Sequence, residues 1–266
     1  MGKIILGYAE SELKNIESDS IDLIFTSPPY AERRKNTYGG IPVDRYISWF
    51  LPIGKELFRV LKPTGSFFLN IKAHTHNGER LLYTYDLVKA IKNELGFRFI
   101  DDLCWVKNAY PGGYKGRFKN GFEPIYHFSK SHVSEITFNP YACGTPIKEE
   151  SLKRAYRKQS GLPKNGSGMA GMKTQNIQKL KLARPSNVIV ANNVSNQFML
   201  KSEHSGTFPI KLVDFFVKSY SNENNVVLDP FAGSGTVGLS CNNNNRDYIL
   251  IDKEFQNVKL MEKVLK

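Results

Sequence analysis

Two short loops near opposite ends of this chain each follow an apolar run that predicts a buried strand. The first loop, Thr26-Ser27-Pro28-Pro29-Tyr30, comes after residues 21–25. The second, Asp229-Pro230-Phe231-Ala232-Gly233-Ser234-Gly235-Thr236, comes after residues 226–228. Uninterrupted apolar runs of this kind are typical of strands buried on both faces of a parallel sheet. In an open α/β sheet, ligands bind where strands end and loops begin, so two distant loops can build one site.

Most of the remaining chain alternates between strand-like runs and segments with helical periodicity. Pro63 and Gly65 are expected to end one helix, and Gly96 the next. The alternation predicts an α/β domain with a parallel sheet. Further strands are expected over 3–6, 66–71, 97–106, 123–128 and 248–251, and helices over 11–16, 46–61, 81–95, 207–220 and 236–242.

A basic stretch that is poor in apolar residues interrupts this pattern between residues 145 and 184. The whole chain has a formal net charge of +12 and a pI of about 9.5, which favours a polyanionic partner. On charge alone, a solvated basic surface is an equal alternative. Candidate contacts to a nucleic-acid backbone lie in the stretch and after the first loop: Lys153, Arg154, Arg157, Lys158, Arg33 and Arg34.

Cysteine usage and hydropathy bear on the compartment. Cys104, Cys143 and Cys241 have neither metal-ligand nor disulfide spacing, which is typical of a reducing environment. The first ten residues lack the apolar core of a signal peptide, and no segment approaches the length and hydropathy of a membrane span. The five histidines are dispersed, and no metal site is expected. We therefore expect a cytoplasmic protein without a membrane segment.

The second loop suits a cofactor that carries a nucleoside. Gly233, Gly235 and Gly238 follow the pattern G-x-G-x-x-G, which permits tight turns and a close approach of a ligand to a helix N-terminus. Asp252 follows the next expected strand, where a carboxylate can accept hydrogen bonds from ribose hydroxyls. A nicotinamide dinucleotide fits poorly because only about one more strand remains after this loop. A single-nucleoside cofactor fits better.

The first loop suits a planar base with an exocyclic amine. Its two prolines stiffen the backbone. The Ser27 hydroxyl and the Pro28 carbonyl can accept the protons of the amine, and the Tyr30 ring can stack on the base. For this loop taken alone, a rigid turn with a packed tyrosine is an equal alternative. The presence and the order of the second loop favour base binding.

In its motifs and their order, the chain resembles the amino-group DNA methyltransferases of the β arrangement. In that family the catalytic loop comes first, a target-recognition region follows, and the cofactor loop comes last. The resemblance implies a Rossmann-like S-adenosylmethionine-dependent methyltransferase fold, α/β, with a mostly parallel twisted sheet and helices on both faces. Segments resembling further family motifs are 59–66, Asn120 with Glu123, and 204–209. The implied parts are a catalytic half (1–130), a target-recognition insert (131–203) and a cofactor-binding half (204–266).

The resemblance also implies an activity and its partners. Family members with Ser at the position of Ser27 are commonly cytosine-N4 enzymes, so we expect methyl transfer from S-adenosylmethionine to the N4 amine of a flipped-out cytosine. Adenine-N6 methylation is the alternative. The expected partner is double-stranded DNA; a homodimer and a cognate restriction endonuclease are left open. The expected catalytic residues are Ser27, Pro28, Pro29 and Tyr30, and the expected cofactor-binding residues are Phe208, Asp229, Phe231, Gly233, Gly235, Thr236 and Asp252.

One departure and three less favoured alternatives accompany this interpretation. Tyr8 stands where related chains often carry an acidic residue that contacts the cofactor adenine. Carbon-5 methylation is disfavoured because none of the three cysteines follows a proline. Glutamine methylation in a protein also uses a Pro-Pro-Tyr loop, but with Asn first and the opposite loop order. A catalytically inactive DNA-binding protein is the alternative from another class.

Overall fold

The computed structural model describes residues 2–32, 40–107, 115–148, 150, 182–192 and 207–265. The chain divides into one unit of Met1–Asn139 with Asn187–Lys266 and a second of Pro140–Ser186. Within the second unit, β8 (Thr145–Pro146) pairs antiparallel with β9 (Leu182–Ala183). All site residues discussed below belong to the first unit.

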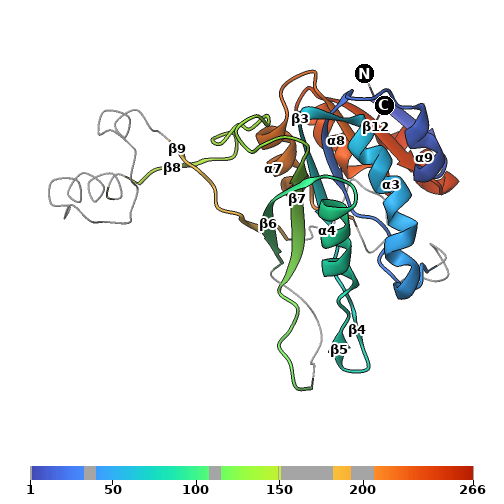
Figure 1. The fold of residues 1–266 in the computed structure, drawn as a ribbon. Helices are drawn as coiled ribbons and strands as arrows, with labels where there is room; N and C mark the ends of the chain where they lie inside the picture. Colours follow the sequence, from blue (N-terminus) through green and yellow to red (C-terminus); the bar gives the residue numbers. More distant parts are fainter. Residues whose placement is uncertain are drawn as a thin grey trace. The chain divides into compact units, whose positions relative to one another are not determined.

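The first unit is built around an eight-stranded sheet in the order β1-β12-β11-β2-β3-β7-β6-β10 (Figure 1). Neighbouring strands pair parallel except at β7, which is antiparallel to both β3 and β6. The bounds are β1 (Gly2–Leu6), β2 (Ile21–Thr26), β3 (Leu61–Asn70), β6 (Arg98–Val106), β7 (Phe122–Ser129), β10 (Val188–Val190), β11 (Val226–Asp229) and β12 (Asp247–Asp252).

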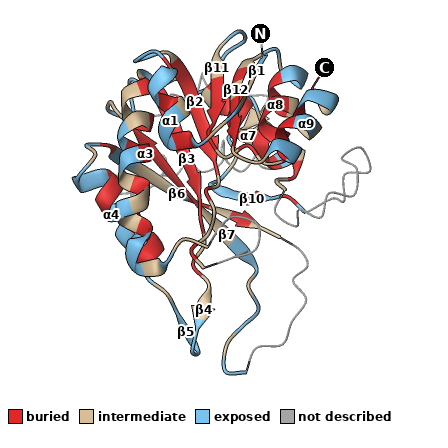
Figure 2. Cartoon of the chain, turned by 90° about the vertical axis from the view of Figure 1, so that its right-hand side faces the viewer, coloured by how far each residue is buried: buried red, intermediate tan, exposed pale blue. Residues whose placement is uncertain are grey.

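Helices cover both faces of this sheet, and its strands are buried between them (Figure 2). In β2, Ile24 packs on the face covered by α1, α3 and α4, while Leu23 and Phe25 pack on the face covered by α7, α8 and α9. This alternation follows from the two-residue period of a strand. The helices are α1 (Ala9–Glu12), η1 (Leu13–Asn15), η2 (Val43–Arg45), α3 (Tyr46–Val60), α4 (Tyr83–Asn93), α7 (Ile210–Tyr220), α8 (Thr236–Asn243) and α9 (Phe255–Val264).

The structure corrects two of the sequence predictions about these elements. The strands β6 and β7 follow each other without a helix, and such neighbours pair antiparallel rather than parallel. Helix α3 ends at Val60, before Pro63 and Gly65, which lie inside β3. A Cβ at Gly65 would lie 2.9 Å from the Asp22 carbonyl oxygen, so the glycine permits β3 to approach β2. The predicted end of the helix is therefore confirmed, but β3 begins at Leu61 and not at the predicted Ser66.

The sequence prediction also missed several elements, among them a hairpin, a helix and a strand of the main sheet. A hairpin of β4 (Thr75–His76) and β5 (Glu79–Arg80) turns at Asn77 and Gly78, both with positive φ. Helix α9 follows β12 and was not predicted. Strand β10 pairs parallel with β6 and extends the sheet into the range 131–203, which was expected to be an insert.

The DNA contacts predicted from the basic residues lie outside the described residues: Arg33, Arg34, Lys153, Arg154, Arg157 and Lys158. They therefore stay predictions. In the described part of the chain, no helix has the length and hydropathy needed to cross a membrane.

Candidate active site

The two predicted loops meet at the C-terminal ends of neighbouring strands. β11 pairs parallel with β2, so the loop after Thr26 and the loop after Asp229 leave the sheet side by side. The buried Thr26 hydroxyl donates to Asp229 Oδ1 at 2.6 Å, which ties the two loop bases together. Both loops line one cavity of about 930 Å³.

All predicted catalytic and cofactor-binding residues except Gly235 line this cavity. Gly235 has a φ of +80°, and a Cβ there would lie 2.7 Å from Met261 Cγ. Its role is to begin α8 with a left-handed residue and to let α9 pack closely. The predicted residues that line the cavity are Ser27, Pro28, Pro29, Tyr30, Phe208, Asp229, Phe231, Gly233, Thr236 and Asp252.

Asp252 forms one corner of the cavity and holds the glycine loop. Its Oδ2 accepts from the Gly233 N–H at 2.8 Å, and its Oδ1 accepts from the Glu254 N–H at 2.8 Å and Asn257 Nδ2 at 3.1 Å. Burial raises the pKa of Asp252, while these donors lower it. A carboxylate has about four acceptor sites, so capacity remains for a ribose hydroxyl.

Gly233 leaves the neighbouring wall of the cavity open. Its φ is +53°, and no other atom lies within 4 Å of the position that a Cβ would take. A side chain there would project into space that is now empty, and L-residues rarely adopt this φ. The bare backbone beside the Asp252 carboxylate therefore fits a nucleoside-bearing group such as S-adenosylmethionine.

Asp229 mainly stabilises the conformation of the loop that follows β11. Its Oδ1 accepts from the Phe231 N–H at 3.0 Å as well as from the Thr26 hydroxyl. Burial raises the pKa of Asp229 to about 7. This carboxyl group shapes the turn between β11 and α8 through main-chain and side-chain donors.

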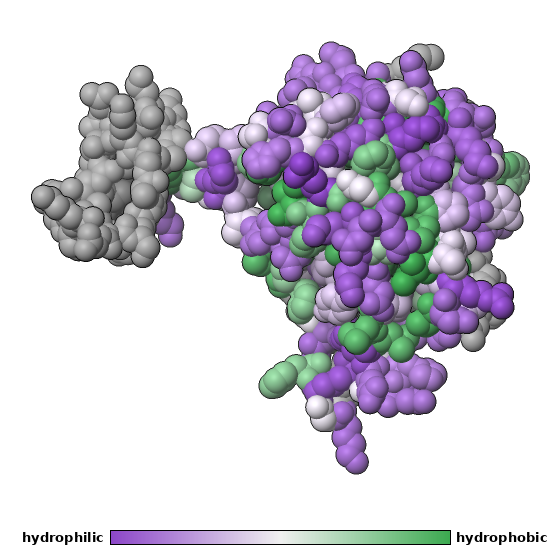
Figure 3. Space-filling view, in the orientation of Figure 1, coloured by the Kyte–Doolittle hydropathy of each residue, from purple (hydrophilic) through white to green (hydrophobic). Residues whose placement is uncertain are grey.

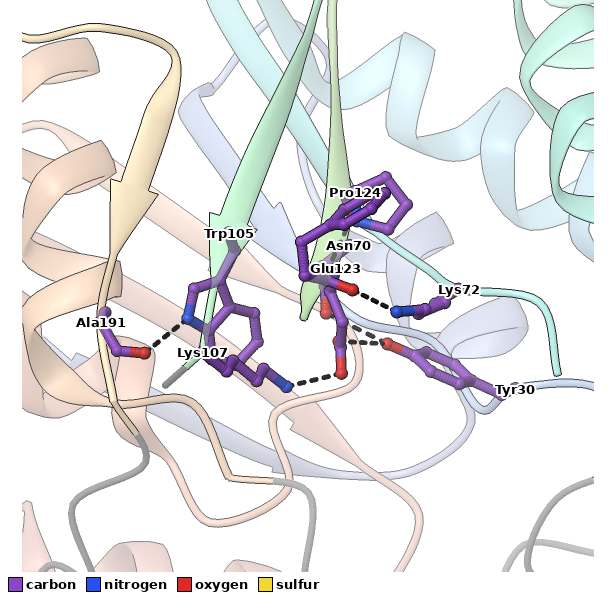
Figure 4. Close-up of polar contacts among 9 residues, drawn as sticks. Tyr30, Asn70, Lys72, Trp105, Lys107, Glu123, Pro124 and Ala191 are labelled. Atoms are coloured by element: carbon purple, nitrogen blue, oxygen red, sulfur yellow. Dashed lines mark hydrogen bonds and ion pairs between the residues drawn. The ribbon is translucent and has the colours of Figure 1, made fainter. Parts of the chain in front are cut away.

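Tyr30 lines the side of the cavity beside β3, β6 and β7, in a network of side chains from these strands and the residues that follow them (Figure 4). Its hydroxyl donates to Glu123 Oε2 at 3.0 Å, with Asn70 Oδ1 also within reach at 3.2 Å. Glu123 Oε1 pairs with Lys107 Nζ at 2.5 Å. Burial, followed by the Glu123 charge, raises the pKa of Tyr30 well above its ordinary value. The tyrosine is therefore neutral, and its ring is held by its hydroxyl.

Lysines and arginines gather on this side of the cavity. Lys107 Nζ lies 3.6 Å from the centroid of the Trp105 ring, and Trp105 Nε1 donates to the Ala191 carbonyl at 2.8 Å. Lys72 Nζ donates to the Phe122 carbonyl, and burial lowers the pKa of Lys72 to about 8. The cationic residues that line the cavity beside the first loop are Lys72, Arg80, Lys107 and Arg117.

Sequence reasoning missed Asn70, Lys72 and Lys107, and it cited Glu123 only as part of a motif. The available signal was polar residues at the end of a buried strand: Asn70 is the last residue of β3, which neighbours β2. Lys107 likewise follows the last residue of β6, but no local signal predicts that it meets Glu123, because their approach depends on the antiparallel pairing of β6 with β7.

Two other residues cited from the sequence also line the cavity. Tyr8 is 66% exposed, and Lys253 Nζ lies 5.9 Å from the centroid of its ring. His74, which was expected on the surface or in a loop, has its Nε2 3.6 Å from Glu32 Oε2. Among the described residues, no group of three or more His, Cys, Asp or Glu is arranged to hold a metal ion.

Comparison with known proteins places these features in a family. A family model described as DNA methylase, N6_N4_Mtase, matches residues 21–263. The type II methyltransferase M.PvuII of Proteus hauseri is 27% identical over 269 residues, which span 93% of this chain and 79% of that protein. The DNA adenine methyltransferase YhdJ of Escherichia coli (strain K12) is 30% identical over 262 residues, which span 97% of this chain and 80% of that protein.

Solved structures show the same fold. The structure of PvuII DNA methyltransferase, described as cytosine-N4-specific, matches with a TM-score of 0.74 at 23% identity, over 98% of this chain and 85% of that chain. A complex of M1.HpyAVI with SAM matches with a TM-score of 0.60 at 21% identity, over 99% of both chains. The predicted α/β methyltransferase fold with a mostly parallel sheet is confirmed.

Proposed function

Because this chain belongs to the DNA methylase family, we propose that it transfers the methyl group of S-adenosylmethionine to the exocyclic N4 amine of a flipped-out cytosine in double-stranded DNA. DNA methylation with this cofactor is the activity of the family, as the sequence resemblance implied. One observation carries the proposal: the Ser27-to-Tyr30 loop and the Gly233–Asp252 corner line a single cavity and are tied together by Thr26 and Asp229.

The amine would be held by two oxygen acceptors. The Pro29 carbonyl already accepts from the Tyr46 hydroxyl at 2.7 Å, whereas none of the hydrogen bonds among the described residues uses the Pro28 carbonyl. With the Ser27 hydroxyl, the Pro28 carbonyl can accept the two amine protons and direct the nitrogen lone pair across the cavity. S-adenosylmethionine supplies the electrophilic methyl group. Alignment of the amine with that methyl group supplies much of the acceleration, and no covalent bond between base and enzyme is needed.

The Tyr30 ring would stack on the flipped base. Flipping costs a few kcal/mol, and stacking on an aromatic ring returns about 1–3 kcal/mol. Because Glu123 and Asn70 hold the tyrosine hydroxyl, the ring meets the base in one orientation. Phe231 and Phe208 line the same cavity and suit the apolar parts of the cofactor.

The choice of cytosine rests on Ser27 and on the similarity to M.PvuII. Adenine-N6 methylation is the second candidate, favoured by the similarity to YhdJ. Mass spectrometry of nucleosides separates the two, after duplex DNA of varied sequence is incubated with the protein and labelled S-adenosylmethionine. We expect labelled N4-methylcytosine; labelled N6-methyladenine would overturn the assignment to cytosine.

A control variant guards this experiment against a contaminating methyltransferase. Tyr30→Ala protein, purified in the same way, should yield less of the same labelled nucleoside. Absence of label in every base with the wild type would contradict methyl transfer to DNA and favour an inactive DNA-binding protein.

The wider setting is also part of the proposal. We place the protein in the cytoplasm and assign DNA-backbone contacts to the basic residues predicted from the sequence, among them Lys153, Arg154, Arg157 and Lys158. A homodimer and a cognate restriction endonuclease stay open, and light scattering of the purified protein would decide the first.

A further inference from the structure

Phe118 is the most exposed large hydrophobic side chain in the described part of the chain, with 96% of its surface accessible. It lies in Lys115-Gly116-Arg117-Phe118-Lys119-Asn120, just before β7. Three cationic residues therefore surround a bare aromatic ring. Aromatic rings among cationic side chains are typical of surfaces that bind nucleic acids through both bases and phosphates.

The segment that carries Phe118 is anchored beside the catalytic loop. Arg117 and Asn120 line the same cavity as Ser27 and Tyr30. Arg80 donates to Asn120 Oδ1 at 2.7 Å and to the Ala73 carbonyl at 2.7 Å. The Lys107 N–H donates to the Gly121 carbonyl at 3.0 Å. The Phe118 ring is thus carried by an anchored segment, two of whose residues, Arg117 and Asn120, line the cavity that also holds Tyr30.

The figures agree with this placement. In Figures 1 and 2, the β4–β5 hairpin and the segment that leads into β7 project together beyond the same end of the sheet. Figure 3 shows that this lower projection is mainly hydrophilic, with small hydrophobic patches. A surface of this kind suits a polyanion that also has apolar faces. Duplex DNA is such a polyanion, because its phosphates flank stacked base pairs.

When a base flips out of the duplex, it leaves a gap into which such a ring can insert. The departed base exposes the faces of its two neighbours and leaves a gap of one base. Apolar side chains that insert between base steps recover part of the unstacking cost. Lys115 and Lys119, on either side of Phe118, can then neutralise phosphates that flank the gap.

We propose that Phe118 inserts into the DNA duplex at the position vacated by the flipped base. The inference rests on the proposed function, because it requires a base to be flipped towards Tyr30. It assigns to the segment 115–120 a role that is separate from sequence recognition, since a stacked ring does not read base edges.

Fluorescence tests the insertion directly. Trp105 is buried and Trp49 partly buried, so a Phe118→Trp variant adds an exposed emitter to a background measured in the wild type. Duplex DNA should quench this added emission, because the indole would stack on bases. Val133→Trp is the matched control: Val133 is 52% exposed and lies after Ser129, the end of β7 that is farther along the strand from segment 115–120.

Activity gives a second readout, in which folding is not at risk because the side chain is exposed. Phe118→Ala should lower kcat for methylation of duplex DNA by about tenfold or more, and Phe118→Leu by less, because leucine can still insert but stacks less well than an aromatic ring. Thermal unfolding and S-adenosylhomocysteine affinity should match the wild type.

The outcomes separate this inference from the proposed function. Label transfer by the wild type with unquenched emission of Phe118→Trp at saturating DNA would overturn the insertion and leave the function standing. Equal quenching of Val133→Trp would also overturn it, since any bound surface would then respond. Absence of label transfer by the wild type would refute the function and the insertion with it. Quenching confined to Phe118→Trp, with label transfer, supports both.

Discussion

The cavity has two corners that are built in different ways. The cofactor corner consists of Asp229, Phe231, Gly233 and Asp252. Its two carboxylates accept main-chain N–H groups that are close in sequence: Phe231 is 2 residues from Asp229, and Gly233 is 19 residues from Asp252. The base corner consists of Ser27, Tyr30, Asn70, Lys107 and Glu123. It is held by side chains that are distant in sequence, since the Tyr30 hydroxyl contacts Asn70, 40 residues away, and Glu123, 93 residues away. Local main-chain contacts make the first corner readable as a motif, whereas the second exists only when the sheet has formed.

The two corners also differ in charge. Asp229 and Asp252 face the cofactor corner, while Lys72, Arg80 and Arg117 line the side of the base corner. Carboxylates suit ribose hydroxyls and a cationic sulfonium, and cationic side chains suit phosphates. Substitutions in one corner should therefore change the affinity for one ligand only, and the predictions below test that separation.

The largest effect is expected at Asp252. Asp252→Ala removes a charged acceptor for ribose hydroxyls and releases the Gly233 N–H. At about 1.5–3 kcal/mol per hydrogen bond to a charged group, affinity for S-adenosylhomocysteine should fall about 100-fold, while DNA affinity is unchanged. Isothermal titration measures both.

A cofactor analogue separates the two roles of Asp252. With a 2′,3′-dideoxy analogue of S-adenosylhomocysteine, wild type and variant should differ much less. An equal loss for both ligands would mean that Asp252 acts only by holding the loop, and wild-type affinity in the variant would refute both roles.

The next largest effect is expected at Tyr30. Tyr30→Ala removes a stacking contact worth about 1–3 kcal/mol, so kcat/KM for DNA methylation should fall roughly 10- to 100-fold. Affinity for S-adenosylhomocysteine should stay at the wild-type value, because Tyr30 is held by Glu123 and Asn70 within the base corner. Tyr30→Phe keeps the ring but loses the bond to Glu123, and should lose less activity. Unchanged turnover and DNA affinity in Tyr30→Ala would refute the stacking role.

A third prediction concerns stability and pH in the cofactor corner. Burial raises the pKa of Asp229 from 3.8 to about 7, so folding favours its protonated form. The contribution of Asp229 is fully present below about pH 4 and is lost as the pH rises through about 7. The free energy of unfolding should fall by up to about 1.4 kcal/mol per pH unit from this group.

The variant Asp229→Asn isolates that contribution. Its Oδ1 can still accept from Thr26 and Phe231, but it does not titrate. In urea denaturation between pH 4 and 8, the stability of the variant relative to the wild type should rise with pH up to about 7 and then level off. A constant difference would show that Asp229 carries no raised pKa.

The smallest effect is expected from a single cation beside the base corner. Lys119→Ala should weaken DNA binding similarly for all sequences and reduce the slope of log K against log salt concentration by about 0.9. Cofactor affinity should not change. Lys14→Ala, on η1, is a control of equal charge. Equal salt slopes for wild type and Lys119→Ala would remove this lysine from the DNA contact.

Several features of the fold could be predicted from the chain alone because their signals are local. The apolar runs at β2, β11 and β12 predicted buried strands, and the glycine at 96, with a φ of +81°, follows α4 as expected. Local signals were incomplete at one place: Pro63 and Gly65 correctly marked the end of α3, but they concealed the start of β3 at Leu61, where Gly65 lets the strand approach Asp22.

The sequence by itself determined the two loops, their order, the family and the cofactor, because each depends on a short run of residues with its own backbone requirements. Only the tertiary structure decided what surrounds Tyr30. Its bond to Glu123 requires β7 to run antiparallel between β3 and β6, and Lys107 reaches Glu123 through the same pairing. It also decided that Gly235 packs against Met261 instead of lining the cavity. Contacts between residues that are 40 and 93 positions apart in the sequence depend on strand order and register, which no short stretch of sequence encodes.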